Sequence, residues 1–255
     1  MKIVDLSVAI ENDVPADPPG LGPKITYTDH TAGAEEVKRF FPGLDISEVP
    51  GGEGWAVEQI TLSAHAGTHL DAPWHFASTM NKGERAWTIE EVPLDWCIRP
   101  GVKLDLRHLP DGYVATAADM EAAVKASDHE LQPFDIVLVN TAAGAAYGTP
   151  AFLGRGCGIG REATLWLMER GVHIAGTDAW SWDAPFPVTA KRFAETRDAG
   201  LIWEGHKAGR EGIFMHMEKL ARLEELPASG FTVSCLPVKI RGGSAGWCRA
   251  VAIFN

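Results

Sequence analysis

Short apolar runs of strand length recur along the whole chain, and they constrain the fold more than any other feature of the sequence. Helical patterns lie between several of them. One begins near Thr116, where Thr116-x-x-Asp119 resembles a capping box, and another covers 161–170 and stops at Gly171. The last two runs are joined by the short loop "RGGSAG", which is typical of antiparallel neighbours. The sequence therefore predicts an α/β fold with a mixed sheet. The runs cover residues 3–10, 56–62, 102–106, 135–139, 172–175, 213–217, 231–240 and 247–254.

The composition is that of an ordinary globular protein, with 45% hydrophobic and 22% charged residues in a chain of 255. A chain of this length can bury one sizeable core or two modest ones. It contains no internal repeat, low-complexity tract or obvious linker, so we expect residues 1–255 to form one domain. Only residues 11–55 differ, because they are rich in Pro and Gly and carry little periodicity. Long loops in compact domains are usually functional or disordered, and we expect this one to border a pocket.

The charge balance indicates which partners to expect. The formal net charge of -11, from 34 acidic and 23 basic residues, repels phosphate backbones and acidic lipid surfaces. No stretch approaches the roughly 20 apolar residues that span a bilayer, and the first residues do not resemble a signal peptide. The four cysteines form no CxxC pair and are expected to be reduced thiols. We therefore expect a cytoplasmic protein with no nucleic-acid or membrane partner.

Residues 65–76, "HAGTHLDAPWHF", place three of the nine histidines and one aspartate within eleven positions. His65, His69, Asp71 and His75 all share one side of an extended chain. If the segment stayed extended, its ends would lie roughly 33 Å apart, at about 3.3 Å per residue. That is too far for ligands of one metal ion, whose bonds are about 2 Å long. The chain must therefore bend after His65.

Gly67 and Pro73 mark where this bend can occur, because Gly tolerates a positive φ and Pro cannot donate a ladder hydrogen bond. The bend would gather the first two histidines and the aspartate around one point, a nitrogen and oxygen set that suits Zn²⁺, Mn²⁺ or Fe²⁺. His75 would then lie close by, placed to move protons near neutral pH. The alternative is that each histidine is separately satisfied by a backbone carbonyl. That explanation suits a lone histidine better than three beside an aspartate.

One tryptophan, Trp74, lies within residues 65–76, and two more, Trp180 and Trp182, lie within residues 176–183. Such rings belong either to the core or to the wall of a pocket for a flat substrate, and both interpretations stay open. Asp178 either accepts a hydrogen bond from a metal-binding imidazole and so orients it, or stabilises a turn. The segment "GGSAG" fits the GxSxG nucleophile elbow, but neither an acid nor a histidine follows Ser244. We therefore interpret it as a hairpin loop.

The pattern HxGTHxDxPxHF in residues 65–76 resembles the signature of the cyclase family, which includes metal-dependent arylformamidases (kynurenine formamidases) and isatin hydrolases. Further similar segments are "VDLS", "FDIVLVNTAAG", "GTDAWSWD" and the stretch from "EGHKAGREGIFMHMEKLARLEELP" to the C-terminus. The resemblance implies a swivelling β/β/α fold with a mixed β-sheet core. It also implies a homodimer or higher homo-oligomer whose active site borders the partner subunit.

The resemblance assigns roles to single residues as well. It makes His75 the catalytic acid and base, and it makes Asp71 and Glu218 bridges between two metal ions. The positions that match the family's metal ligands are His65, His69, Asp71, His206 and Glu218. From the residues alone, Glu218 falls at a strand end before a short helix, where an acid could merely favour the helix N-terminus. His216 lies on the same side of that strand and competes with Glu218 for a ligand role.

The activity implied by the resemblance is metal-dependent hydrolysis of an amide, lactam or ester bond in a small aromatic substrate, with one or two Zn²⁺ or Mn²⁺ ions per subunit. An arylformamidase of tryptophan catabolism would convert N-formylkynurenine to kynurenine, and the tryptophans named above would bind the substrate. Hydrolysis of isatin or of a lactone remains an alternative. So does a cyclase or lyase that uses the same metal to stabilise an enolate, and so does a metal-bound carrier without turnover.

Overall fold

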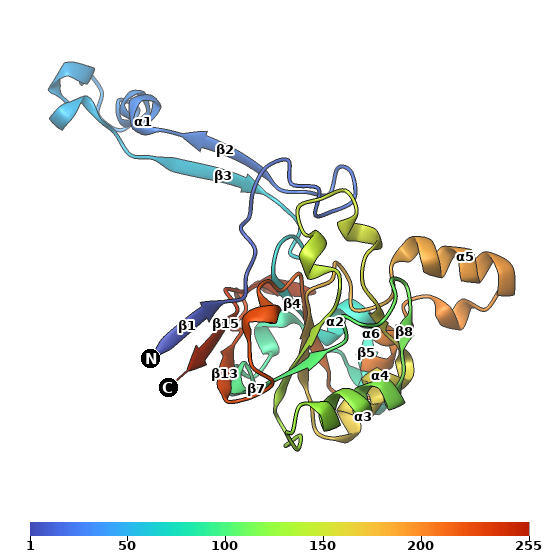
Figure 1. Ribbon diagram of the computed structural model, residues 1–255. Coiled ribbons are helices and arrows are strands. Elements are labelled where there is room, and N and C mark those ends of the chain that lie inside the picture. The colour runs from blue at the N-terminus through green and yellow to red at the C-terminus, as the bar shows by residue number, and fades with distance from the viewer. Residues whose placement is uncertain (255) are drawn as a thin grey trace.

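A nine-stranded mixed sheet forms the centre of the protein in a computed structural model that describes residues 1–254 (Figure 1). The four strands β7, β9, β11 and β12 run parallel, and antiparallel strands flank them on both sides. The predicted α/β fold with a mixed sheet is therefore confirmed. In spatial order the strands are β1 (Lys2–Asp5), β15 (Val251–Phe254), β13 (Phe231–Ser234), β7 (Ile98–Asp105), β9 (Ile136–Asn140), β11 (Ile174–Thr177), β12 (Met215–Glu218), β4 (His69–Asp71) and β14 (Ala245–Trp247).

Both faces of the sheet are buried at its central strand, β9, whose five residues are all buried. Successive side chains of a strand point to opposite faces. Ile136 and Leu138 accordingly belong to one hydrophobic cluster, whereas Val137 and Val139 belong to another. The second cluster lies under α3 (Ala117–Ala126) and α4 (Arg161–Glu169), which cover that face through Met120, Ala163 and Leu167. A strand buried on both faces reads as a continuous apolar run, which is why this one was visible in the sequence.

The two predicted helices begin and end at the expected signals. Thr116 and Asp119 form a capping box at the start of α3. The chain leaves α4 at Arg170 and turns at Gly171, whose φ is +77°. No helix among residues 1–254 has the length and apolar character needed to cross a bilayer.

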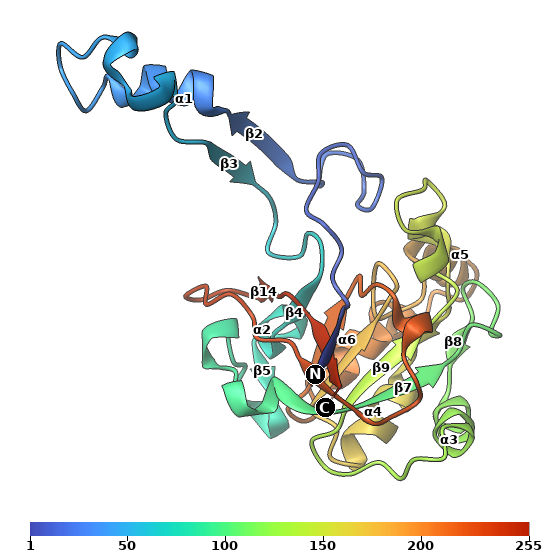
Figure 2. The same cartoon turned by 60° about the vertical axis from the view of Figure 1, so that its left-hand side comes forward.

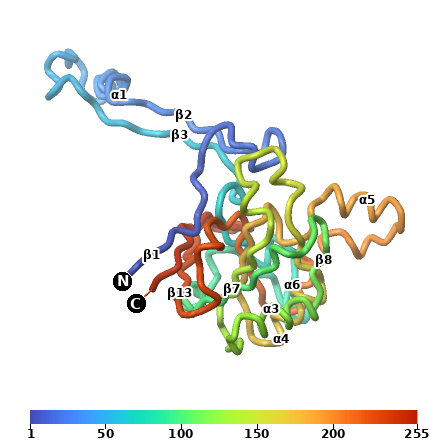
Figure 3. Tube along the Cα trace, viewed as in Figure 1, coloured from blue at the N-terminus to red at the C-terminus, as the bar shows by residue number. Residues whose placement is uncertain are grey.

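The C-terminal strands pair differently from the sequence prediction. The loop "RGGSAG" does not join two paired strands of the sheet, because β13 pairs with β15 while the loop leads to β14 at the opposite edge. A single antiparallel bridge, Pro237 with Cys248, is what remains of the expected hairpin. Figure 3 shows the two chain ends side by side, where β1 pairs with β15.

Residues 24–61 form an arm that stands clear of the sheet in two views (Figures 1 and 2). Its stem is an antiparallel pair of strands, and one short helix and two 3₁₀ turns form its tip. The sequence predicted a strand at residues 56–62, which matches β3 (Val57–Thr61), but a long loop over residues 11–55, so the arm as a whole was not anticipated. The strands and the helix of the arm are β2 (Lys24–Thr28), α1 (His30–Val37) and β3 (Val57–Thr61). The remaining α-helices and strands of the molecule are α2 (Pro73–Phe76), β5 (Thr79–Met80), β6 (Glu84–Arg85), β8 (Val114–Ala115), β10 (Gly158–Ile159), α5 (Phe186–Thr196) and α6 (Glu204–Gly209).

Candidate metal centre

The histidine segment bends at the two predicted positions. Gly67 adopts a φ of +63°, and Pro73 is the first residue of α2. Between them, His69–Asp71 forms β4, whose three residues are all buried. The strand therefore carries two of the predicted ligands into the sheet, while the bends return His65 and His75 toward them.

Strand pairing brings a distant segment to the same place. In the antiparallel register of β4 and β12, His69 lies opposite Glu218 and Asp71 lies opposite His216. These residues are two apart on each strand, so all four side chains project from the same face. His206, on α6, completes the group from a third direction. The site thus joins residues that are more than a hundred positions apart in the sequence.

Asp71 lies at the centre of the group, and its side chain is fully buried. Its Oδ1 is 2.9 Å from His65 Nδ1 and 3.3 Å from His69 Nε2. Its Oδ2 is 3.4 Å from His216 Nε2 and 3.8 Å from the Nε2 atoms of both His75 and His206. Five imidazoles therefore face one carboxylate.

Glu218 supplies a second carboxylate to the same group. Its Oε1 lies 3.3 Å from His216 Nε2 and 3.5 Å from His206 Nε2, and its Oε2 lies 3.7 Å from His69 Nε2. Its Oε1 also accepts a hydrogen bond from the backbone N–H of Trp182 at 2.8 Å. That bond fixes the orientation of the carboxylate, whose two oxygens both face histidines.

The donor atoms fall into two groups that share Asp71, each tight enough to hold a metal ion. One consists of His65, Asp71 and His75, and the other of Asp71, His206, His216 and Glu218. Within each group the ligand atoms lie within 4.8 Å of one another. Imidazole and carboxylate donors suit Zn²⁺ and Mn²⁺. His69 Nε2 lies beside both groups, through its contacts with Asp71 and Glu218.

Buried polar atoms without partners support the fit to a metal. Both carboxylate oxygens of Asp71 and the Nε2 of His69 make no aligned hydrogen bond, although they are shielded from solvent. Leaving such groups unsatisfied is costly in a protein interior. Burial would raise the pKa of Asp71, but His69 and His65 hold that pKa well below its usual value. An anionic, buried and unpaired carboxylate among imidazoles is what a divalent cation requires.

Two imidazoles of the cluster are oriented by contacts of their Nδ1 atoms with oxygen atoms outside the cluster. His69 Nδ1 is 2.9 Å from the Gly67 carbonyl, and His206 Nδ1 is 2.5 Å from Asp183 Oδ2. If each Nδ1 carries the proton and donates it to that oxygen, each Nε2 keeps a free lone pair toward the site. Asp183 also accepts the backbone N–H groups of Gly205 and His206, at 2.7 and 3.0 Å. The orienting carboxylate is therefore itself fixed.

His75, like His65, is partly exposed to the cavity, whereas the other three imidazoles of the cluster are buried. Its side chain is 21% exposed, and its ring packs against those of His65, Trp203 and His206. Burial lowers its pKa to about 4, with His65 and His206 adding to the effect against the opposing charge of Asp71. The ring is therefore neutral at pH 7 in the structure as it stands.

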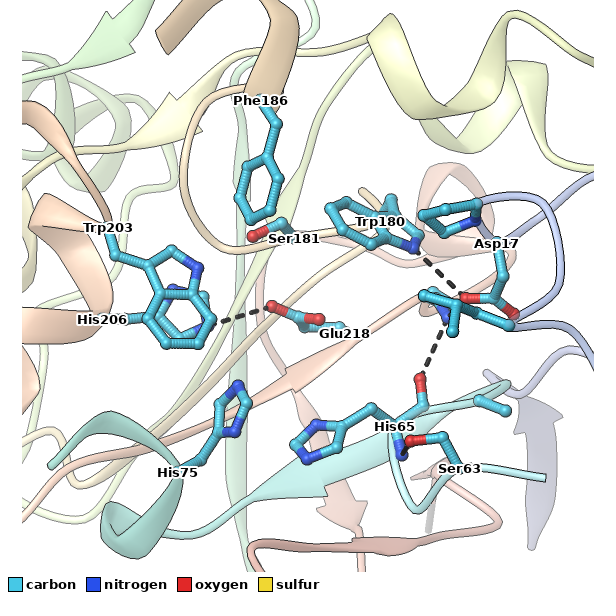
Figure 4. Close-up of a pocket in the computed structure, with 14 residues that line it drawn as sticks. Asp17, Ser63, His65, His75, Trp180, Ser181, Phe186, Trp203, His206 and Glu218 are labelled. Carbon is cyan, nitrogen blue, oxygen red and sulfur yellow. Dashed lines mark hydrogen bonds and ion pairs between the residues drawn. The ribbon is translucent and has the colours of Figure 1, made fainter. Parts of the chain in front are cut away.

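A cavity of about 210 Å³ opens directly above the group (Figure 4). His65, His75, His206 and Glu218 line its floor, and Trp180, Phe186 and Trp203 line its walls. Of the three predicted substrate-binding tryptophans, only Trp180 is among the lining residues. Trp182 is fully buried and stacks on His216, and Trp74 is 42% exposed outside the cavity lining. The stretch before the arm borders the cavity, as expected of residues 11–55, through Asp17, Pro18 and Leu21.

A buried lysine completes one wall. Successive residues of a strand normally face opposite ways, but Lys219 follows Glu218 with a φ of +55°, so both side chains reach the cavity. Lys219 Nζ forms an ion pair with Asp17 and donates a hydrogen bond to the His65 carbonyl at 3.0 Å. Asp17 also accepts the indole N–H of Trp180 at 3.2 Å. This pair ties the stretch before the arm to the metal centre.

Several residues of the site were not predicted from the sequence. His216 was treated as a competitor of Glu218, yet both reach the cluster, and the period-two spacing of 216 and 218 was the available signal. Ser244, set aside as part of a loop, lies 2.9 Å from His65 Nε2 through its Oγ. Asp178, a candidate support for a ligand, instead accepts hydrogen bonds from Asn140 and Thr141. Asp183 performs that supporting role for His206.

Comparison with known proteins is consistent with this geometry. The family model described as "Putative cyclase" matches residues 4–184, more than half of the chain. The chain belongs to the cyclase family. Two curated relatives in this family are kynurenine formamidases. That of Erythrobacter litoralis is 28% identical over 196 residues, covering 76% of each chain. That of Paracidovorax citrulli is 27% identical over 204 residues, covering 76% of this chain and 78% of the relative.

Solved structures share the cyclase-family fold along nearly the whole chain. Isatin hydrolase A from Ralstonia solanacearum superposes with a TM-score of 0.76 at 21% identity, covering 100% of this chain and 92% of its own. Isatin hydrolase A from Labrenzia aggregata, bound to benzyl benzoate, gives a TM-score of 0.73 at 21% identity, covering 99% and 93%. The family and fold predictions are therefore confirmed.

Proposed function

We propose that the protein is a metal-dependent hydrolase that cleaves an amide, lactam or ester bond of a small aromatic molecule. The observation that carries this proposal is the cluster of imidazoles around the unpaired carboxylate of Asp71, at the floor of a small cavity with aromatic walls. The kynurenine formamidases among its relatives support C–N hydrolysis and make an N-formylated aniline such as N-formylkynurenine the first candidate substrate.

We further propose Zn²⁺ or Mn²⁺ as the cofactor, with one or two ions per subunit. The residues that would hold it are His65, His69, Asp71, His206, His216 and Glu218. A bound divalent ion of this kind polarises a carbonyl and lowers the pKa of water to about 7. Asp71 would contribute to either ion, because one of its carboxylate oxygens faces His65 and His69 and the other faces His206 and His216.

His75 is placed to move the protons of the reaction. It is the most exposed imidazole of the cluster after His65, whose side chain is 26% exposed, and its Nε2 faces Asp71 across 3.8 Å. In amide hydrolysis, the attacking water loses a proton and the nitrogen of the breaking C–N bond gains one. A single imidazole beside both positions can take the first proton and return the second. The products are a carboxylic acid and an amine.

The cavity walls determine what can bind. Trp180, Phe186 and Trp203 present ring faces and edges to the space above the cluster. Aromatic walls favour flat apolar substrates and exclude bulk water from the reacting atoms. The Asp17–Lys219 pair adds one polar wall, where a substrate oxygen can accept a hydrogen bond from the ammonium group.

The test is a turnover screen of metal-loaded protein in ¹⁸O-labelled water with N-formylkynurenine, isatin and a panel of lactones. Hydrolysis of any of them must place one labelled oxygen in the acid product. Turnover of an N-formyl aniline would support the formamidase assignment, and turnover of isatin or a lactone would support the alternative substrates. Product without label would replace hydrolysis by the cyclase or lyase chemistry that the same residues can perform.

A further inference from the structure

Ser244 places a hydroxyl group against one imidazole of the metal cluster. Its Oγ lies 2.9 Å from His65 Nε2, in a contact with the geometry of a hydrogen bond. Ser244 belongs to the segment "GGSAG", which matches the GxSxG pattern, and it is 179 positions from His65 in the sequence. A hydroxyl in this place can determine which ring nitrogen of His65 carries the proton.

His65 presents a different ring nitrogen to Asp71 from the other imidazoles of the cluster. It faces the carboxylate through Nδ1, which lies 2.9 Å from Asp71 Oδ1. The Nε2 of His65 is thereby turned away from the carboxylate and toward Ser244. The other four imidazoles face Asp71 through Nε2, and they belong to His69, His75, His206 and His216.

The contacts of the two ring nitrogens favour a proton on Nε2 of His65. Asp71 Oδ1 makes no aligned hydrogen bond, although Nδ1 is only 2.9 Å away. A proton on Nδ1 would therefore lack a well-placed acceptor, whereas a proton on Nε2 has Ser244 Oγ as its acceptor. With the proton on Nε2, Nδ1 keeps a lone pair. A separation of 2.9 Å between this lone pair donor and Asp71 Oδ1 suits two ligands of one ion, whose bonds are about 2 Å long.

The loop that carries Ser244 is fixed to β4, the strand that carries Asp71. The carbonyl oxygen of Ser244 accepts the backbone N–H of Ala72 at 2.9 Å. The next residue, Ala245, begins β14 and pairs with Asp71 in the antiparallel register of β14 and β4. The hydroxyl is therefore held beside the cluster by the backbone of the sheet, and not by a free loop.

We propose that Ser244 is a positioning residue that fixes His65 as an Nδ1 ligand of the metal. Only one of the two donor groups contains His65, together with Asp71 and His75. The hydroxyl should therefore act mainly on the ion held by that group, and less on an ion held by the residues of α6 and β12. This inference rests on the proposed function through its metal site, and not through its substrate.

Long-range ¹H–¹⁵N NMR of the Zn²⁺-loaded full chain tests the proton position directly, because the two nitrogens of a ring give different signals according to which carries the proton and which the metal. The signals of His65 are identified by their loss in His65→Asn. We expect the ring proton of His65 on Nε2, and that of His69, whose Nδ1 contacts the Gly67 carbonyl, on Nδ1. A ring proton of His65 on Nδ1 in the wild type would overturn the proposal, whatever the activity of the protein.

A competition titration with Zn²⁺ measures the effect of the hydroxyl on binding. Ser244→Ala should weaken the more affected ion about tenfold, the low end of the range for loss of a group that orients a ligand imidazole. Ser244→Thr keeps a hydroxyl and should retain affinity near that of the wild type. The matched control is Ser127→Ala, which removes a hydroxyl hydrogen bond of 2.7 Å to the Val124 carbonyl at the end of α3. Unchanged affinity in Ser244→Ala, or an equal loss in Ser244→Thr or in the control, would contradict the proposal.

These outcomes separate the role of Ser244 from the proposed function. A Ser244→Ala protein with wild-type Zn²⁺ affinity sinks the positioning role and leaves the hydrolase standing. A protein that shows the expected proton position and loss of affinity, but turns over none of the screened substrates, does the reverse. A wild type that binds no Zn²⁺ at all would overturn both.

Discussion

Replacing Asp183 by asparagine should weaken metal binding without removing any residue of the metal cluster. Asp183 Oδ2 is 2.5 Å from His206 Nδ1 and also accepts the backbone N–H of that residue. An asparagine can present its NH₂ group to Nδ1. The imidazole would then have to accept there and carry its proton on Nε2, the atom that faces Asp71 and Glu218. A protonated Nε2 has no lone pair for a metal.

Loss of such a supporting carboxylate costs about 10–100-fold in metal affinity. At about 1.4 kcal/mol per tenfold, this amounts to roughly 1.4–2.8 kcal/mol. The assay is a competition titration of Zn²⁺ or Mn²⁺ against a chromogenic chelator. The structure offers a matched control, Asp135→Asn, because Asp135 pairs with His129 at 2.9 Å outside the cluster. Equal affinity in Asp183→Asn and the control would refute the reasoning that His206 binds metal through Nε2.

Three further changes test other parts of the account. His75→Ala should abolish turnover while metal content by elemental analysis stays near that of the wild type; loss of both together would make His75 a ligand instead. Lys219→Met should destabilise the fold by about 3 kcal/mol in chemical denaturation, because it leaves the Asp17 carboxylate unpaired in the cavity wall, and adding Asp17→Asn should recover most of the loss. No recovery in the double variant would show that the pair does not carry the effect. Burial raises the pKa of Asp178 to about 7, so between about pH 4 and pH 7 the folded state holds a proton that the unfolded state releases. As the pH rises through this range, the stability of the wild type should fall by up to about 4 kcal/mol relative to Asp178→Asn. Parallel stability profiles for the two proteins would contradict this.

The part of the site that lies close together in the sequence could be predicted from the residues. His65, His69, Asp71 and His75 share one parity, and Gly67 and Pro73 indicated the bends that gather them. Such local geometry follows from backbone rules alone. The central strands of the sheet were visible for a similar reason, since strands buried on both faces read as continuous apolar runs.

The remaining parts depend on long-range packing that no local pattern records. Only the register of β4 against β12 places His216 and Glu218 opposite Asp71 and His69, and a shift of one residue would turn both away. The left-handed backbone of Lys219 likewise has no sequence signal, because lysine rarely adopts it.

Most of the arm escaped prediction because residues 11–55 carry little hydrophobic periodicity, and only β3 lies within a predicted run, residues 56–62. Prediction of a strand relies on alternation between buried and exposed side chains. In β2 no residue is buried and exposure does not alternate strictly along the strand, so the sequence did not distinguish it from the Pro- and Gly-rich loop around it.

The most direct test of the central claim is a crystal structure of the protein loaded with Zn²⁺ or Mn²⁺, with anomalous data collected at the metal edge. We expect an anomalous peak within about 2.0–2.3 Å of an Asp71 oxygen and of imidazole nitrogens from both β4 and β12 or α6. A fully loaded crystal whose only anomalous peaks lie away from Asp71 would contradict the account.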